Sequence, residues 1–336
     1  MTNITVHHMD TYYYTLSLYI LGLCQLPVNM LALYCILYKS HRNMSFYYRF
    51  LLAKYQALVN FCDFAITILG APIVFFPYIG WLPTGVLSWL GVPTFVQMVI
   101  GIYAVQWVSG TIILLFYTRY TCSHTDSTST MSDKKKIILG CLLCLSFHPE
   151  VLANYYELPE NMDKAKLELA AIWKDPPDLL WNRNTLVLGE CRVCISRILV
   201  AVNGMITVVP TSIFFLRTLR NLTRRNAKLS ASTLKIQRKF LWVLVGQISV
   251  PAILMAAPLF FSFGAISYNP VMSSFCVFAI SNHGFIGSLF LLFSNQPYRD
   301  FILSKLGKER QNTIINVGAS TNYDLTKTVK IRSINL

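Results

Sequence analysis

Residues 217–239 read RTLRNLTRRNAKLSASTLKIQRK, and this run holds eight lysines and arginines but no aspartate or glutamate. Long apolar stretches border it on both sides. A basic block beside segments of membrane-spanning length is a topology signal, because such loops stay on the cytosolic side of the bilayer. The same block offers positive charge to anionic lipid headgroups or to a cytosolic partner. These residues predict a membrane protein.

The overall composition agrees with a membrane setting. Hydrophobic residues make up 54% of the 336 residues and charged residues only 13%, and the mean hydropathy is +0.48. Soluble domains carry about 25% charged residues, and a soluble chain of this length could not bury so much apolar surface without splitting into domains. The net charge of +14 would indicate nucleic-acid binding in a soluble protein. Here we assign it to the loops between spans and expect no nucleic-acid partner.

The nine cysteines do not show the spacing of a disulfide framework. Most of them lie inside apolar stretches, where a thiol behaves as a small hydrophobic group. Cys191 and Cys194 form a C-x-x-C pair, but the sequence has no second pair to complete a zinc site. Redox chemistry and simple packing are the two interpretations of this pair. We expect neither a metal nor a cofactor.

Seven apolar stretches are long enough to cross a bilayer, which takes about 20 residues of helix. They cover residues 14–38, 50–78, 90–117, 137–156, 193–216, 240–263 and 271–293. The fourth is the weakest, because His148, Pro149 and Glu150 lie in its outer half. Beyond the seventh, residues 298–310 have an amphipathic pattern that predicts a helix along the inner membrane surface.

The charges that flank these stretches predict the orientation. Asp10 precedes the first span, whereas Lys39, Arg42 and Arg49 follow it, so the N-terminus should lie outside. With seven crossings, every predicted cytosolic segment is net positive and every outer segment is neutral or negative. We therefore predict an all-α membrane protein, a bundle of seven transmembrane helices with its C-terminus in the cytosol. Asn3, in the sequon Asn-Ile-Thr, should then accept a glycan. The expected regions are an extracellular N-terminus (1–13), the transmembrane domain with its surface helix (14–305) and a polar cytosolic tail (306–336).

No nucleophile elbow, zinc-protease, paired-carboxylate or P-loop pattern is present, so we do not expect an enzyme. Polar residues inside the spans are more informative, because each costs a few kcal/mol unless it faces the bundle or water. Asp63, deep in the second span, is either a hydrated centre that sets the balance between conformations, with a cation as a possible occupant, or a hydrogen-bonded packing residue. Pro251 and Pro258 in the sixth span produce either a moving kink or a static one.

Two further groups of residues are candidates for binding. In the outer half, polar side chains could line a ligand cavity or simply pack between helices: Gln97, Tyr103, Gln106, Glu150, Arg197 and Asn203. At the inner end of the third span, Arg119 and Tyr120 either point into the bundle and control the access of a partner, or extend toward lipid phosphates.

Six pieces of sequence, in this order and spacing, resemble a known receptor family. GVPTFVQ (91–97) enters the third span, LLFYTRY (114–120) leaves it, and STLKIQ (232–237) precedes the sixth. FLWVLVGQISVPAILMAAP (240–258), His283-Gly284 and QPYR (296–299) complete the set. The chain resembles the nematode serpentine chemoreceptors of the Str superfamily, closest to class H (Srh), with class I (Sri) as its neighbour. The resemblance covers about residues 15–305.

The resemblance implies an olfactory G-protein-coupled receptor in the plasma membrane of sensory neurons, in their cilia. It would bind a small molecule outside and activate a heterotrimeric G protein inside. The expected docking face combines Arg119 and Tyr120 with Arg224, Arg225 and Lys228. Residues 117–118 are Tyr-Thr, where receptors of this general type often have an acid, and no cysteine opens the third span to form the usual outer disulfide.

Two other classes of function remain as alternatives. A seven-span ligand-gated channel would place its N-terminus inside, against the charges. A small-molecule transporter should carry more charges within the membrane than Asp63 and Glu150 provide. Staining of an N-terminal epitope on unpermeabilised cells would separate the channel from the receptor.

Overall fold

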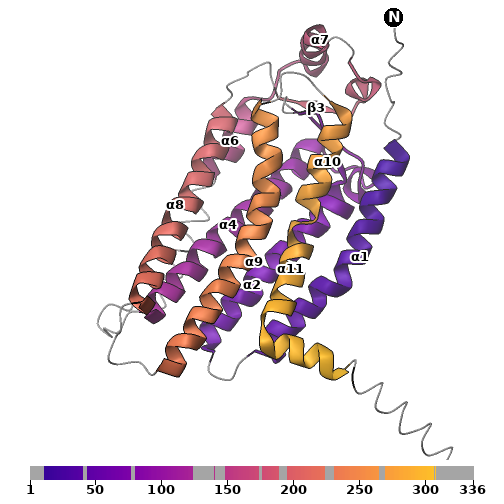
Figure 1. The fold of residues 1–336 in the computed structure, drawn as a ribbon. Helices are drawn as coiled ribbons and strands as arrows, with labels where there is room; N and C mark the ends of the chain where they lie inside the picture. Colours follow the sequence, from indigo (N-terminus) through magenta and orange to yellow (C-terminus); the bar gives the residue numbers. More distant parts are fainter. Residues whose placement is uncertain are drawn as a thin grey trace, which may run out of the picture.

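The computed structural model describes residues 11–40, 44–76, 80–123, 140, 148–173, 176–188, 195–223, 231–264, 269–305 and 307. Long helices run side by side, with a small sheet and short helices gathered at one end (Figure 1). The bundle contains α1 (Thr11–Tyr38), α2 (Phe46–Phe64), α4 (Thr94–Ser123), α6 (His148–Tyr156), α8 (Ile195–Thr223), α9 (Ala231–Gly264), α10 (Pro270–Ser281) and α11 (His283–Ser294). Residues 296–305 form a further helix that leaves the bundle at an angle (Figure 1).

The long helices have the composition of membrane spans. Apolar residues surround α1 and α4 on all sides instead of forming one stripe, which is the pattern of a helix without a solvent face. Among the described residues, five helical segments are long and apolar enough to cross a membrane: Thr11–Tyr38, Phe46–Gly70, Thr94–Ser123, Ile195–Thr223 and Pro270–Ser294. The predicted all-α membrane class is confirmed.

Two predicted spans differ from the structure in their details. The second span ends in a π-helix, η1 (Ala65–Gly70), and not at residue 78, because Ala71 adopts a left-handed conformation (φ 37°) and Pro72 begins a strand. The seventh span is broken between α10 and α11 at Asn282. The Asn282 side chain donates a hydrogen bond to the carbonyl of Phe278 (2.8 Å), and such side-chain bonds compete with the helical ladder.

The basic run quoted above is largely helical and not a loop. α8 extends through Thr223 and α9 begins at Ala231. The first part of the run therefore belongs to α8 and the last part to α9. Arg224, Arg225 and Lys228 lie outside the described residues, as do most of the fourth predicted span before His148, the first ten residues with Asn3, and residues 308–336.

The sheet and short helices at one end form what we call the cap. Strands β1 (Pro72–Val74), β2 (Gly80–Pro83) and β3 (Leu186–Val187) form an antiparallel sheet in the order β1-β2-β3, with Ile73 opposite Leu82 and Trp81 opposite Leu186. The short elements beside it are α3 (Val86–Trp89), α7 (Met162–Ile172) and η3 (Asp178–Trp181). α7 lies in the segment that joins α6 to α8.

The cap is held on α1 and α10 by a shared apolar cluster. Its buried members are Tyr14, Leu18, Ala71, Ile73, Phe75, Leu82, Leu169, Trp173, Leu180, Val187 and Val277. The Tyr14 hydroxyl also donates to the carbonyl of Pro72 (2.7 Å). The ammonium of Lys166, which is only 2% exposed, donates to the carbonyl of Asn182 (2.7 Å), and burial lowers the pKa of Lys166.

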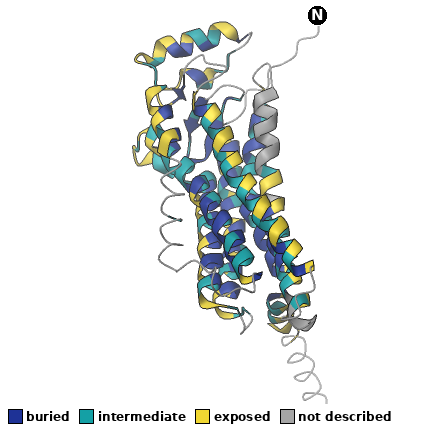
Figure 2. Ribbon diagram, turned by 90° about the vertical axis from the view of Figure 1, so that its left-hand side faces the viewer, coloured by how far each residue is buried: buried dark blue, intermediate teal, exposed yellow. Residues whose placement is uncertain are grey.

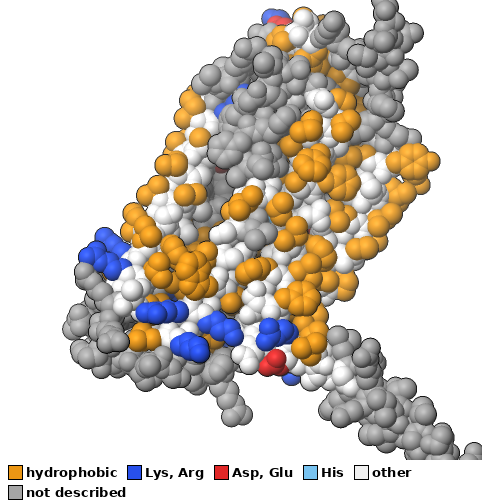
Figure 3. All heavy atoms as spheres, in the orientation of Figure 1, with side chains coloured by type: hydrophobic (Ala, Val, Ile, Leu, Met, Phe, Trp, Pro, Cys, Tyr) orange, Lys and Arg blue, Asp and Glu red, His pale blue; other side chains and the backbone are white. Residues whose placement is uncertain are grey.

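The two ends of the bundle differ in charge. Buried residues line the inner faces of the helices, while their outward faces are exposed (Figure 2). A broad apolar surface covers the middle of the bundle, and lysines and arginines gather at the end opposite the cap (Figure 3). We call this end, where α8 ends and α9 begins, the basic end. A large apolar cluster fills the bundle there, with Leu115, Leu241 and Tyr298 among its most buried members.

Candidate functional site

Three of the six candidate ligand residues meet in one cluster inside the bundle. Gln106 on α4 donates from Nε2 to Oε2 of Glu150 on α6 (2.9 Å), and Asn203 on α8 donates from Nδ2 to the same oxygen (2.6 Å). Glu150 is 7% exposed and Gln106 4%. We call these three residues the Glu150 cluster, and it joins three helices by polar contacts.

The acceptors of this cluster exceed its donors. Oε1 of Glu150 accepts no hydrogen bond from any described residue, and the carboxylate makes no ion pair with a described Lys, Arg or His. The buried Oε1 of Gln106 also lacks a partner among those residues. Buried polar atoms are nearly always paired, because leaving one unpaired costs about 1–3 kcal/mol. The two Oε1 atoms of the cluster can therefore accept hydrogen bonds from a donor outside the described residues.

Aromatic residues precede the Glu150 cluster on two of its helices, with Tyr103 three residues before Gln106 on α4 and His148 two residues before Glu150 on α6. The Tyr103 ring, one helical turn before Gln106, meets the ring of His148 edge to face, with centroids 5.4 Å apart. The ring of Trp107, four residues later on α4, has its centroid 6.4 Å from that of Tyr103. Tyr103 is thus close to the start of α6, which carries Glu150.

Gln97 and Arg197 stand apart from this cluster. The Nε2 of Gln97 donates to the carbonyl of Val92 (2.8 Å) and to the hydroxyl of Ser88 (3.3 Å), so it fastens the start of α4 to the turn before it. Arg197 is half-buried near the start of α8, and the hydrogen bonds of Glu150 go to Gln106 and Asn203 instead.

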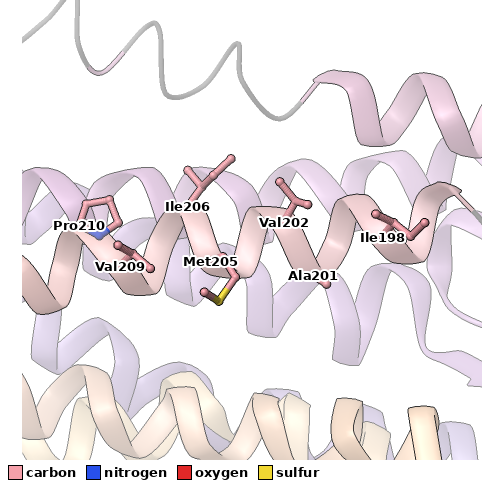
Figure 4. Close-up of a pocket in the computed structure, with 7 residues that line it drawn as sticks. All are labelled: Ile198, Ala201, Val202, Met205, Ile206, Val209 and Pro210. Carbon is pink, nitrogen blue, oxygen red and sulfur yellow. The ribbon is translucent and has the colours of Figure 1, made fainter.

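A larger hollow lies on one face of α8 and is separate from the polar cluster. Its volume is about 610 Å³, and seven apolar residues of α8 line it (Figure 4): Ile198, Ala201, Val202, Met205, Ile206, Val209 and Pro210. All seven come from a single helix, and none belongs to the Glu150 cluster. An open apolar face on a membrane helix is suited to lipid chains, so we do not assign it to a specific ligand.

A second polar cluster surrounds Asp63 in the middle of the bundle. Oδ1 of Asp63 lies 3.1 Å from Nδ1 of His283 and accepts the backbone N–H of Gly284 (3.3 Å), while Oδ2 accepts from Nδ2 of Asn29 (3.2 Å). The side chains of Asp63 and His283 are 3% and 2% exposed. His283 Nδ1 also lies 2.6 Å from the carbonyl of Ile280, so this nitrogen must carry the hydrogen. We call Asp63, His283, Gly284 and Asn29 the Asp63 cluster.

Further buried polar groups extend the Asp63 cluster. Ser288 on α11 donates to Oδ1 of Asn29 (2.7 Å) and accepts from Nε2 of Gln56 on α2 (2.8 Å). Nearer the cap, Gln25 on α1 donates to the carbonyl of Ser281 (3.0 Å). These bonds tie α1, α2, α10 and α11 together, as expected for polar groups inside a membrane bundle.

Both irregular helices meet at this cluster. The π-helix η1 begins two residues after Asp63, and the break between α10 and α11 lies immediately before His283. π-helical turns and helix breaks occur frequently at functional positions. Pro251 and Pro258, the other residues predicted to set the conformational balance, lie within α9, which is assigned as one continuous helix.

At the basic end, Arg119 points into the bundle and not toward lipid phosphates. Its guanidinium lies 3.9 Å from the ring centroid of Tyr48 on α2 and 5.3 Å from that of Phe240 on α9. Tyr120 stacks on Phe214 of α8 at 5.8 Å. Of the two interpretations of Arg119, the structure therefore favours an inward side chain.

The basic end is closed in this structure. A cavity of about 10 Å³ remains between Arg119, Cys122, Ser123, Thr218, Leu222, Gln237 and Leu241, which is room for about one water molecule. Nε of Arg119 and Oε1 of Gln237 are buried there without a hydrogen-bond partner among the described residues. The guanidinium of Arg238 on α9 donates from Nε to the carbonyl of Leu222 at the end of α8 (3.1 Å).

Sequence reasoning missed His283, Asn29, Ser288 and Arg238. Asn29 and Gln56 are polar residues inside apolar spans, so a search for every such residue would have found them. His283 was noted only as part of a family motif, and its pairing with Asp63 joins residues far apart in the chain. Arg238 is one of eight basic residues in the run 217–239, and nothing in the sequence distinguishes it from the other seven.

Comparison with known proteins agrees with this architecture. The family model described as serpentine type 7TM GPCR chemoreceptor Srh matches residues 10–308. No curated protein matches the chain. The match concerns a receptor family and not an enzyme class, and it lends no support to the channel or transporter alternatives. With most of its length covered, the chain belongs to the Srh family of serpentine seven-transmembrane chemoreceptors, as its sequence motifs predicted.

Proposed function

We propose that this receptor binds a small-molecule cue at the Glu150 cluster and activates a heterotrimeric G protein at the basic end. The cap end then faces outside and the basic end faces the cytosol of a sensory neuron, with the plasma membrane of its cilium as the site of action. The observation that carries the proposal is that one helix, α4, holds both Gln106 and Arg119. They are separated by 13 residues of sequence, or roughly 20 Å of helix.

The contacts of α4 support a route between the two ends. α4 packs on α2 and on α8, so it touches the elements of both polar clusters. A ligand that pulls on Glu150 and Gln106 would shift α4 relative to α6 and α8. Because α4 carries Arg119 between Tyr48 and Phe240, that shift would change the packing of α9 at the basic end.

The Asp63 cluster is suited to set the balance between the resting and active arrangements. It holds α2 and α11 together through a buried carboxylate and imidazole, at the point where both helices depart from regular geometry. Such a cluster has few alternative partners inside a membrane, so it favours discrete arrangements over gradual ones. A ligand shifts this balance only by binding one arrangement more tightly.

The basic end supplies the features that a G-protein surface needs. In this structure its cavity is almost filled, and Arg119 and Gln237 each have a buried atom without a hydrogen-bond partner among the described residues. Outward movement of α9 would expose both groups to a partner. Arg224, Arg225 and Lys228 would add positive charge at the same end, and the alternative role for them is attachment to anionic lipid, worth about 1 kcal/mol per residue.

The test uses cells that express the full chain with a surface tag, challenged with a small-molecule panel. We expect Glu150→Gln to lose binding and activation together. Arg119→Ala, and the triple change of Arg224, Arg225 and Lys228 to Gln, should keep ligand binding and lose G-protein activation. Surface staining and a thermal unfolding measurement serve as controls for expression and folding. Activation that survives both basic-end variants would contradict the proposed docking surface.

A further inference from the structure

We propose that the group recognised by the Glu150 cluster is a protonated amine, so that the cues of this receptor are cationic small molecules. This inference rests on the proposed function, because it names the ligand class of the same site. Three observations on the described residues carry it: a buried carboxylate that none of them pairs with a counter-ion, two acceptor atoms to which none of them donates, and aromatic rings on the same two helices.

The carboxylate of Glu150 is buried without an ion pair to a described residue. Glu150 is 7% exposed inside the bundle, and no described Lys, Arg or His forms an ion pair with it. A buried charge is retained in a protein when it is paired or meets a ligand, because an uncompensated one is costly. Asp63, the comparable acid of the bundle, has His283 at 3.1 Å. Among the described residues Glu150 has only amide donors, so a cation that pairs with it would have to come from outside them.

The free acceptors then define the hydrogen bonding of the ligand. Oε2 of Glu150 already accepts from Gln106 and Asn203, and neither these nor any other described residue donates to Oε1 of Glu150. Oε1 of Gln106 is buried without a partner among the same residues. An ammonium group has three donors and no acceptor, which matches this set. A carboxylate or phosphate ligand would add acceptors where donors are missing, and it would repel Glu150.

The aromatic rings complete the match. Tyr103 lies one turn from Gln106 on α4, and His148 lies two residues before Glu150 on α6, with the two rings 5.4 Å apart. Aromatic faces attract ammonium groups, most strongly where water is excluded. None of the residues that line the apolar hollow on α8 belongs to the Glu150 cluster, so we do not include the hollow in the proposed amine site.

The experiment compares amines with neutral molecules of the same skeleton on the purified full chain in lipid nanodiscs. The probes are phenethylamine against phenethyl alcohol, and hexylamine against hexanol, each titrated while thermal unfolding is followed. We expect the amines to raise the unfolding temperature at concentrations at least about tenfold lower than the alcohols require. Glu150→Gln should remove this preference, and Glu160→Gln, the same change at an exposed position of the cap-end loop, should keep it.

Two further variants keep the test decisive. Glu150→Asp retains the charge and should retain the preference for amines, with weaker binding. Glu157→Gln removes a carboxylate that accepts the N–H and hydroxyl of Ser196; it should lower the unfolding temperature of the free receptor, whereas Glu150→Gln should leave it equal or higher. Alcohols that bind as well as amines, no response to any amine, or an amine response that survives Glu150→Gln would each overturn the proposal.

G-protein activation is measured with the same probes on the same variants. Amine binding that depends on Glu150 without any activation would leave the ligand class intact and contradict the proposed signalling function. Activation by neutral or anionic compounds alone would leave the signalling function intact and contradict the proposed ligand class.

Discussion

At the scale of single residues, Gly284 shows how tightly the Asp63 cluster is packed. A Cβ added there would overlap Oδ2 of Asp63 and lie 2.5 Å from Cγ1 of Val59, and the backbone N–H of Gly284 donates to Asp63. We predict that Gly284→Ala destabilises the receptor by about 1–3 kcal/mol, the usual cost of overpacking a filled core. Thermal unfolding in nanodiscs measures this directly.

Gly204→Ala is the matched control, since it makes the same change within a helix. A Cβ at Gly204 meets nothing within 4 Å, so the variant should be neutral or slightly stabilising through the higher helix propensity of alanine. Equal stability of the two variants would mean that Asp63 and α11 are not in close contact.

The residue scale also separates what sequence could and could not supply. Glu150, Gln106 and Asn203 were among the six candidates predicted from sequence, because polar groups inside apolar spans must face one another or a ligand. Their pairing geometry was not predictable, since a shift of one residue along α8 would turn Asn203 away from Glu150. The Asp63–His283 pair joins the second and seventh spans, and only the packed structure brings those positions together.

At the scale of helices and strands, hydropathy located the spans well and failed at their ends. The predicted second span ran to residue 78, yet the helix ends at Gly70 and Pro72–Val74 form strand β1 of the cap. Hydropathy reports burial and does not distinguish burial by lipid from burial by other protein segments. The break at Asn282 was missed because one polar residue hardly changes an average over 20 apolar ones.

Arg238 links α9 to the end of α8 at the basic end. Arg238 of α9 donates to the carbonyl of Leu222, one of the carbonyls that lack a partner at a helix C-terminus. This bond holds α9 against α8 in the closed arrangement. We predict that Arg238→Ala raises G-protein activation without ligand by about fivefold, near the low end of typical coupling energies because the side chain is exposed.

Arg217→Ala is the control for this variant, because Arg217 is an exposed arginine at the same end of α8. Removal of its charge should leave basal activation unchanged. Nucleotide exchange on a purified G protein, at matched receptor amounts, provides the measurement. If both variants raise activation equally, the general positive charge of this end sets the basal level, and the bond to Leu222 does not.

At the scale of the whole molecule, the distribution of charge and the cap predict the same orientation. Lysines and arginines gather at the end opposite the cap (Figure 3), and basic segments stay in the cytosol. The cap closes over α1 and α10 with an apolar cluster and a three-stranded sheet, a construction suited to the extracellular side. α1 begins at the cap end, so the N-terminus should be extracellular.

Glycosylation at Asn3 tests this orientation without knowledge of the ligand. The sequon at Asn3 lies only a few residues before α1, and it can receive a glycan only if it enters the secretory lumen. We predict a glycosidase-sensitive mass shift that Asn3→Gln abolishes. The sequons at Asn43 and Asn221 should remain unmodified in the same protein, because Asn43 follows the end of α1 in sequence and Asn221 lies in the last turn of α8, at the basic end. An N-terminal epitope should stain on intact cells. Staining only after permeabilisation would reverse the orientation and place the Glu150 cluster on the cytosolic side of the bilayer, where a chemoreceptor could not meet an external amine.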